Sequence, residues 1–97
     1  MRFELLVEVR LRPGIADPQG ATIERALPAL GFERVDTVRV GKAIRLSVHA
    51  NDEAAALHTA TQLVERLLAN PVIEEADITV LAAHVGDGVG AATGGAA

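Results

Sequence analysis

The sequence predicts an α+β fold, a two-layer βαββαβ sandwich of ferredoxin-like character with a four-stranded, mainly antiparallel sheet and two helices on one face. Three observations lead to this prediction. Apolar residues alternate with polar ones in four short segments, they recur at helical spacing in two longer segments, and the order is strand, helix, strand, strand, helix, strand. Two helices can cover only one face of such a sheet, so a two-layer arrangement is the economical one.

The first strand is expected at residues 3–11, where every odd position is apolar. A Pro-Gly pair ends it, and Asp17 followed by a proline is typical of a helix start. The aspartate side chain accepts from free amides, and proline has no amide to leave unbonded. This helix is expected to end at Gly31, with a kink or a frayed last turn at Pro28, because proline has no N–H for the helical hydrogen bond.

The middle of the chain predicts a hairpin. Residues 35–40 and 43–50 both fit strands, and the tight turn Gly41-Lys42 lies between them. The second strand is the clearer of the two, since four apolar residues alternate with Arg45, Ser47 and His49.

The second helix is expected to begin after Asn51-Asp52, which supplies a cap, and to end at Asn70-Pro71, because a residue before proline resists helical geometry. A last strand follows at residues 75–80. Residues 82–97 contain six alanines and five glycines without an apolar period. We therefore expect one α+β domain at residues 1–81 and a disordered tail at residues 82–97.

Composition narrows the class of protein. With 97 residues, 49% of them apolar but only 2% aromatic, the chain must build a small core from aliphatic side chains. A chain of this size buries only about 60–65% of its unfolded surface, so a homodimer or tetramer is expected. The formal charge of -4 opposes binding to nucleic acid. No apolar run approaches the ~20 residues that cross a bilayer, and no signal peptide is visible, so we expect a cytoplasmic protein without a membrane partner.

No pattern in the sequence predicts a catalytic, cofactor-binding or metal-binding residue. Cysteine is absent, Gly41-Lys42 lacks the upstream glycine and the following hydroxyl of a P-loop, and the glycine-rich stretch at 86–90 opens no helix. The histidines have no ligand partner at metal spacing: His49, His58 and His84. The carboxylates around the last strand are interpreted as a solvated edge that discourages aggregation: Glu74, Glu75 and Asp77.

Several residues instead predict contacts with other proteins. Glycine in a first helical turn costs up to ~1 kcal/mol relative to alanine, so Gly20 indicates the close approach of another group. Lys42 is the single lysine beside eight arginines, which favours a role for its ammonium group. The predicted partner-binding residues are Asp17, Gln19, Gly20, Arg39, Gly41, Lys42 and Asn70. Structural roles stay open beside this one: capping for Asp17, a turn for Gly41 and helix termination for Asn70.

Three segments in a fixed order carry a family resemblance: residues 17–20 (DPQG), 38–42 (VRVGK) and 67–74 (LLANPVIE). They resemble the PurS subunit family of phosphoribosylformylglycinamidine synthase, from about residue 1 to residue 81. The resemblance implies a small non-catalytic subunit that joins a glutaminase subunit to a synthetase subunit in purine biosynthesis and assists ammonia delivery. It also implies that ATP and Mg²⁺ are used by the assembled complex, with no cofactor bound by this chain. Arg39 and Lys42 are then expected to dock onto an acidic patch of the synthetase subunit.

Two other classes use a similar element order. A ligand-sensing regulatory domain of ACT type remains an alternative, with residues 13–20 as its ligand loop. An RNA-binding domain is disfavoured, because Phe3 is expected on the helix-covered face, where it is not available to stack on bases.

Overall fold

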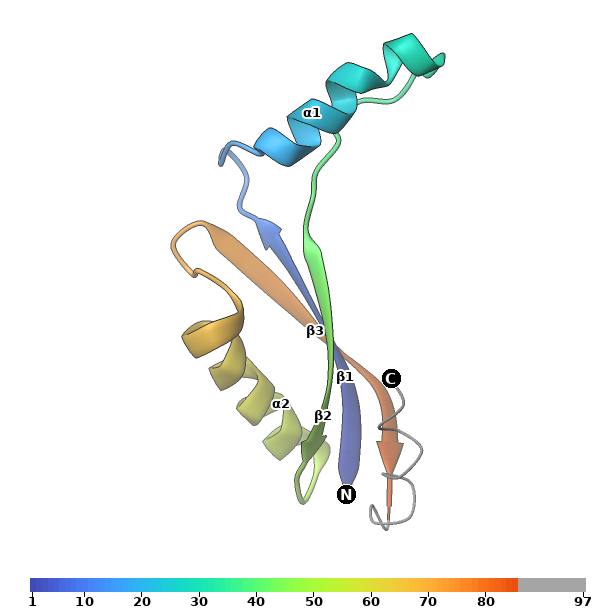
Figure 1. Ribbon diagram of the computed structural model, residues 1–97. Coiled ribbons are helices and arrows are strands. Elements are labelled where there is room, and N and C mark those ends of the chain that lie inside the picture. Colours follow the sequence, from blue (N-terminus) through green and yellow to red (C-terminus); the bar gives the residue numbers. More distant parts are fainter. Residues whose placement is uncertain (86–97) are drawn as a thin grey trace.

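The computed structural model describes residues 1–85 and contains one antiparallel sheet with the strand order β2-β1-β3. The central strand β1 (Arg2–Leu11) pairs with β2 (Lys42–His49) on one side and with β3 (Glu74–His84) on the other (Figure 1). The alternation that predicts the first strand is confirmed, since Phe3, Leu5, Val7 and Val9 are all buried. The most apolar strand therefore occupies the middle of the sheet.

One helix covers the sheet. α2 (Glu53–Leu63) begins at Asp52, whose Oδ1 accepts a 2.8 Å hydrogen bond from the Ala55 amide, which confirms the predicted cap. Its buried residues Ala56 and Ala60 are small and pack against Phe3, so the helix approaches the strands closely. A π-helical turn, η2 (Val64–Leu68), completes this helix before the chain turns into β3.

The first helix projects beyond the end of the sheet (Figure 1). α1 (Pro18–Ala26) starts at the Asp17 cap as predicted, and the chain then narrows into a short 3₁₀ helix, η1 (Pro28–Leu30). The change at Pro28 agrees with the expected disturbance of the last turn, and Gly31 ends the segment in a left-handed conformation with φ 91°. We refer to residues 12–41, which leave and rejoin the sheet, as the arm. With the arm extended, the molecule measures 52 × 29 × 17 Å.

The predicted four-stranded sheet is wrong, because residues 35–40 form no strand and Gly41-Lys42 forms no hairpin turn. The amide of Val38 donates to Glu24 Oε1 at 3.0 Å, and the amide of Val40 donates to Asp17 Oδ2 at 2.7 Å. Thr37 adopts a positive φ of 57°, which interrupts an extended run. The segment is thus bound to α1 through side chains rather than to the sheet through a backbone ladder.

Two further expectations need correction. Two helices were predicted on one face of the sheet, but of the helices in residues 1–85 only α2 covers it, while α1 packs mainly along its own arm. The domain boundary also shifts, because β3 reaches His84 and so includes three residues assigned to the tail. The rest of the predicted tail, residues 86–97, lies outside the described part of the chain.

The core beneath α2 generates a stability prediction. Leu5 has no exposed surface, so replacing it with alanine should lower the free energy of unfolding by about 2–5 kcal/mol through lost burial and a residual cavity. The matched change Leu67→Ala removes the same atoms from a side chain that is 75% exposed, and should cost no more than about 0.5 kcal/mol. Chemical denaturation at one fixed protein concentration measures both values. Equal losses would contradict the placement of the core.

Candidate partner-binding site

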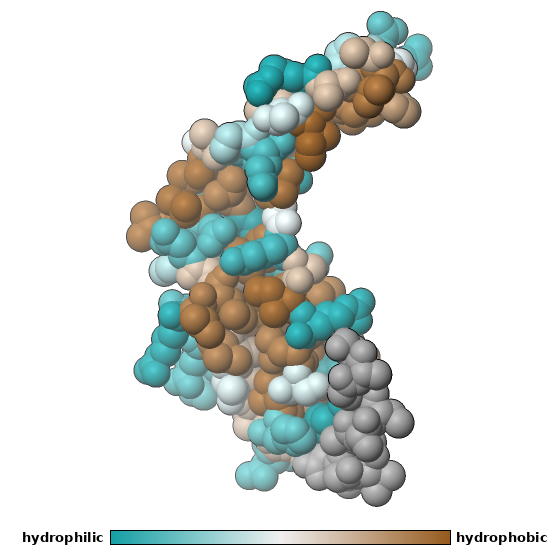
Figure 2. Space-filling model, viewed as in Figure 1, coloured by the Kyte–Doolittle hydropathy of each residue, from teal (hydrophilic) through white to brown (hydrophobic). Residues whose placement is uncertain are grey.

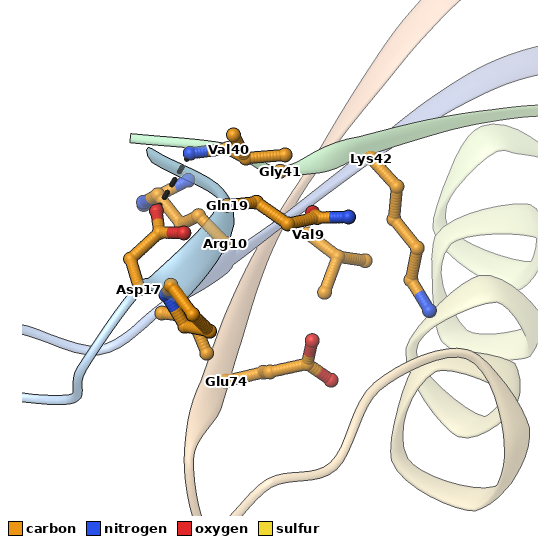
Figure 3. A pocket seen from close by; sticks show the side chains of 10 residues that line it. Val9, Arg10, Asp17, Gln19, Val40, Gly41, Lys42 and Glu74 are labelled. Carbon is orange, nitrogen blue, oxygen red and sulfur yellow. Dashed lines mark hydrogen bonds between the residues drawn. The ribbon is translucent and has the colours of Figure 1, made fainter. Parts of the chain in front are cut away.

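A cavity of about 300 Å³ lies where the arm meets the sheet (Figure 3). Its walls are the end of β1, the first turn of α1, the segment from Val40 to the start of β2, and Glu74 at the start of β3. Segments far apart in the sequence therefore meet at one place. Four of the seven predicted partner-binding residues line this cavity: Asp17, Gln19, Gly41 and Lys42.

Asp17 holds the two sides of the arm together. Its Oδ1 accepts from the Gly20 amide at 2.8 Å, and its Oδ2 accepts from the Val40 amide at 2.7 Å. The side chain is only 6% exposed, and Arg39 Nε lies 3.9 Å from Oδ2. The Gly20 amide, then the Val40 amide, and less strongly the Arg39 charge lower the pKa of Asp17 below its ordinary value. The cap predicted from sequence is thus also a tertiary contact.

Two glycines allow backbones to meet closely beside this carboxylate. A Cβ at position 20 would lie 2.3 Å from the Val38 carbonyl oxygen, and a Cβ at position 41 would lie 2.6 Å from the Val9 carbonyl oxygen. The sequence indicated a close approach at Gly20, and the approaching group belongs to the same chain. Gly41 is required by the neighbouring strand rather than by the predicted turn. Contact of either glycine with a partner protein stays a prediction.

The other polar side chains of segments 17–20 and 38–42 differ in the contacts that they make within the chain. Arg39 Nη2 donates to the Ile15 carbonyl oxygen at 3.2 Å, so this guanidinium is tied to the arm in addition to its contact with Asp17. Lys42 and Gln19 are exposed. In Figure 3 Gln19 extends toward Lys42, whose side chain runs on in the direction of α2, and the Glu74 carboxylate faces the space between them, whereas Asp17 turns toward Val40.

Asn70 organises the loop before β3. Its Oδ1 accepts from the Val72 amide at 3.1 Å, its carbonyl oxygen accepts from Glu74 at 2.7 Å, and its amide donates to Glu74 Oε1 at 2.7 Å. Arg12 clamps the loop through two hydrogen bonds from its guanidinium to the Pro71 carbonyl oxygen, at 2.9 and 3.1 Å. Asn70 does not line the cavity itself, but it positions Glu74, which does.

Glu24, Arg12 and Glu74 help to shape this region and were missed as site residues by the sequence analysis. Glu24 binds the Val38 amide across the arm, and Arg12 binds the Pro71 carbonyl oxygen in a loop that is distant in the sequence. No local pattern signals such distant contacts. Glu74 did carry a usable signal, because a glutamate four residues after Asn70 can accept from the Asn70 amide.

The carboxylates interpreted as a solvated edge are partly neutralised. Arg10 Nε lies 3.1 Å from Glu75 and Arg10 Nη1 lies 2.7 Å from Asp77, across the β1–β3 pair. Among residues 1–85, no group of three or more candidate ligands is arranged to hold a metal ion. The same residues contain no helix long and apolar enough to cross a membrane.

Comparisons with known proteins agree on one family. Residues 4–82 match the family described as PurS, phosphoribosylformylglycinamidine (FGAM) synthase. The PurS subunit of Synechocystis sp. is 41% identical over 72 residues, covering 74% of this chain and 72% of the relative. The crystal structure of the PurS subunit from Thermotoga maritima has a TM-score of 0.78 at 36% identity, covering 84% of this chain and 93% of that one. A chain in the structure of PurLQS from Thermotoga maritima has the same TM-score and identity, covering 84% of this chain and 99% of that one.

The two-sided contact of Asp17 predicts a pH-dependent arm. Because its pKa is lowered in the folded protein, its stabilising effect is complete above the ordinary carboxyl pKa and is lost as the pH falls through the lowered value. Asp17→Asn should therefore speed amide hydrogen exchange in α1 at pH 7, since the two amides donate to different oxygens and the NH₂ group that replaces one of these oxygens cannot accept. The ratio of variant to wild-type exchange should approach one in acid.

The control for this test is Asp36→Asn, because within the described residues the Asp36 carboxylate accepts only from the neighbouring Thr37 hydroxyl. It should leave exchange in α1 unchanged. Equal exchange in wild-type protein and Asp17→Asn at pH 7 would show that the carboxylate does not hold the arm.

Proposed function

The chain belongs to the PurS family of FGAM synthase subunits, and we propose that it holds the glutaminase and synthetase subunits of that enzyme together. As a PurS subunit it is a small part of a glutamine-dependent ligase of purine biosynthesis. One observation carries the assembly role. The junction of arm and sheet unites the segments 17–20 and 38–42 in a fixed geometry and leaves Gln19 and Lys42 exposed.

The chemistry is assigned to the larger subunits in this proposal. The sequence has no phosphate-binding loop and no cysteine nucleophile, so ATP, Mg²⁺ and glutamine are taken to bind elsewhere in the complex. The small subunit then assists ammonia delivery by keeping two active sites in register. The proposed location of the assembled enzyme is the cytoplasm. A ligand-sensing role of ACT type is not favoured, because every relative named above is a PurS subunit.

Self-association is the second part of the proposal. The arm carries large apolar side chains that its own sheet does not cover, among them Leu30, 69% exposed, and Phe32, 56% exposed. Figure 2 shows apolar surface extending along the arm at the upper end of the molecule. Burying each such side chain contributes roughly 1.5–3 kcal/mol, which a second copy of the chain can supply. We therefore propose that the homodimer contact lies on the arm.

Reconstitution tests the assembly role. The purified chain should show no ATPase, glutaminase or amidine-forming activity, and glutamine-dependent FGAM formation by a mixture of the two larger subunits should require it. The measurement is product formation with and without the chain, beside a direct assay of the glutaminase and synthetase subunits with ammonia as the nitrogen donor. Full glutamine-dependent activity without the chain would sink the assembly role.

Light scattering tests self-association. Wild-type protein at tens of micromolar should have at least twice the 10.1 kDa mass of one chain. The double change Leu30→Ser and Phe32→Ser should shift the mass toward one chain while the circular dichroism spectrum is kept. Changing Leu67 and Val72 to serine provides the matched control, because both are exposed outside the arm, and the mass should stay unchanged. A monomeric wild-type protein would contradict self-association. An unchanged mass for the arm variant would show that the contact does not lie on the arm.

A further inference from the structure

A group of charged side chains lies on the face of the sheet opposite α2, at the end away from the arm (Figure 1). β1 begins there, and Arg2 stands in register with His49 on β2 and with His84 on β3. The next residue, Phe3, belongs to the core, so these three side chains belong to the open face. We refer to the following residues of this face as the basic cluster: Arg2, Glu4, Arg45 and His84.

The basic cluster carries more positive than negative charge. Glu4 Oε2 pairs with His84 Nε2 and lies 4.0 Å from Arg2 Nη2. The hydrogen bond from His84, and less strongly the charges of Arg2 and Arg45, lower the pKa of Glu4. Within residues 1–85, no other carboxylate lies within ion-pair distance of Arg2 or Arg45. One carboxylate therefore faces two arginines, and the histidines add further positive charge whenever they are protonated.

The guanidinium of Arg2 lacks an acceptor. Its side chain is only 7% exposed, and its Nε has no hydrogen-bond partner. The 4.0 Å that separates Arg2 Nη2 from Glu4 is too long for a hydrogen bond. A buried charged donor that loses its hydration and gains no acceptor is unfavourable. The basic cluster is therefore suited to one further anionic group.

The same chain has a carboxylate within reach. β3 carries the chain to His84, and the one acidic residue that follows in the sequence is Asp87, three positions further on. Three residues span at most roughly 10 Å, whereas paired strands lie only about 5 Å apart, so the chain can return across the start of β1. Asp87 stands between Gly86 and Gly88, and glycine accepts the backbone conformations that such a reversal needs.

We propose that the carboxylate of Asp87 binds Arg2 and Arg45 of the same chain and so anchors the C-terminal tail on the open face of the sheet. The match to the PurS family ends at residue 82, so this contact is a feature of this chain beyond the family region. It does not depend on the proposed function. It gives the tail a docking site in place of the disorder that its composition predicts.

A tethered carboxylate suits the basic cluster better than an anion from solution. Arg45 is exposed, and an ion pair at an exposed residue is too weak to hold a dilute anion by itself. A short linker supplies Asp87 at an effective concentration on the order of millimolar, whatever the composition of the solution. Occupancy by the tail therefore needs no further ligand.

Titration of the Asp87 carboxyl group by NMR, in the full-length chain, tests the proposal. Two neighbouring arginines should lower its pKa, so that its acid dissociation constant is about tenfold or more above that of an aspartate in an unstructured peptide. Arg45→Met should reduce this constant by about threefold or more. Arg66→Met is the matched control and should leave it unchanged. Arg66 is also exposed and makes no ion pair or hydrogen bond within the described residues, but it lies in η2, which continues the helix on the other face.

A second measurement separates the tail from other anions. Asp87→Asn leaves the basic cluster open, so calorimetry should show inorganic phosphate binding about threefold or more tightly to this variant than to wild type. Equal phosphate binding by the two proteins overturns the proposal and assigns the cluster to a free anion.

The remaining outcomes also decide the question. An ordinary pKa for Asp87 in the wild-type chain overturns the docking of the tail. Equal effects of Arg45→Met and Arg66→Met indicate general charge attraction and overturn the site. The arm variant with Leu30→Ser and Phe32→Ser should keep the lowered pKa, because the contact lies within one chain. A lowered pKa that disappears together with self-association assigns the contact to the tail of a second copy and overturns the proposal.

Discussion

The carboxylate of Asp17 is the contact on which the position of the arm depends. One oxygen fixes the start of α1 at Gly20, and the other fixes the returning chain at Val40. An ionised carboxylate suits this place because it accepts on both sides and donates on neither. The core lies mainly under α2, so directional polar contacts rather than burial in that core hold the two sides of the arm together.

The elements that were predicted correctly are those that local chemistry decides. β1 follows from strict alternation, both helix starts follow from an aspartate cap, and the change at Pro28 follows from a missing amide. Residues 35–40 alternate well enough to resemble a strand, but their amides bind Glu24 and Asp17, and a one-dimensional pattern cannot show this competition. The candidate site was likewise predicted only where a local pattern decides it. The sequence indicated that something approaches Gly20, but only the fold shows that it is the Val38 carbonyl oxygen.

The error in the predicted fold and the function of the chain are connected. Had residues 35–40 and α1 completed the sheet and its helical layer, Leu30 and Phe32 would have had an obvious place to be buried. Their exposure instead provides surface at one end of a small molecule whose core lies at the other. Such a division suits an assembly subunit, because contact surface can be presented without loosening the packed sheet.

The central position of β1 also constrains how the protein is made. Of the three strands β1 is synthesised first, yet one of its two neighbours, β3, begins some 70 residues after it. At about 5–20 residues per second, the most apolar strand waits several seconds for its second partner. During that interval β1, which contains Leu5 and Val7, can pair with β2 along one edge, but its other edge has no partner strand. An unpaired strand edge invites pairing with other nascent chains. The sheet therefore closes only after β3 has been synthesised, however early the other two strands are complete.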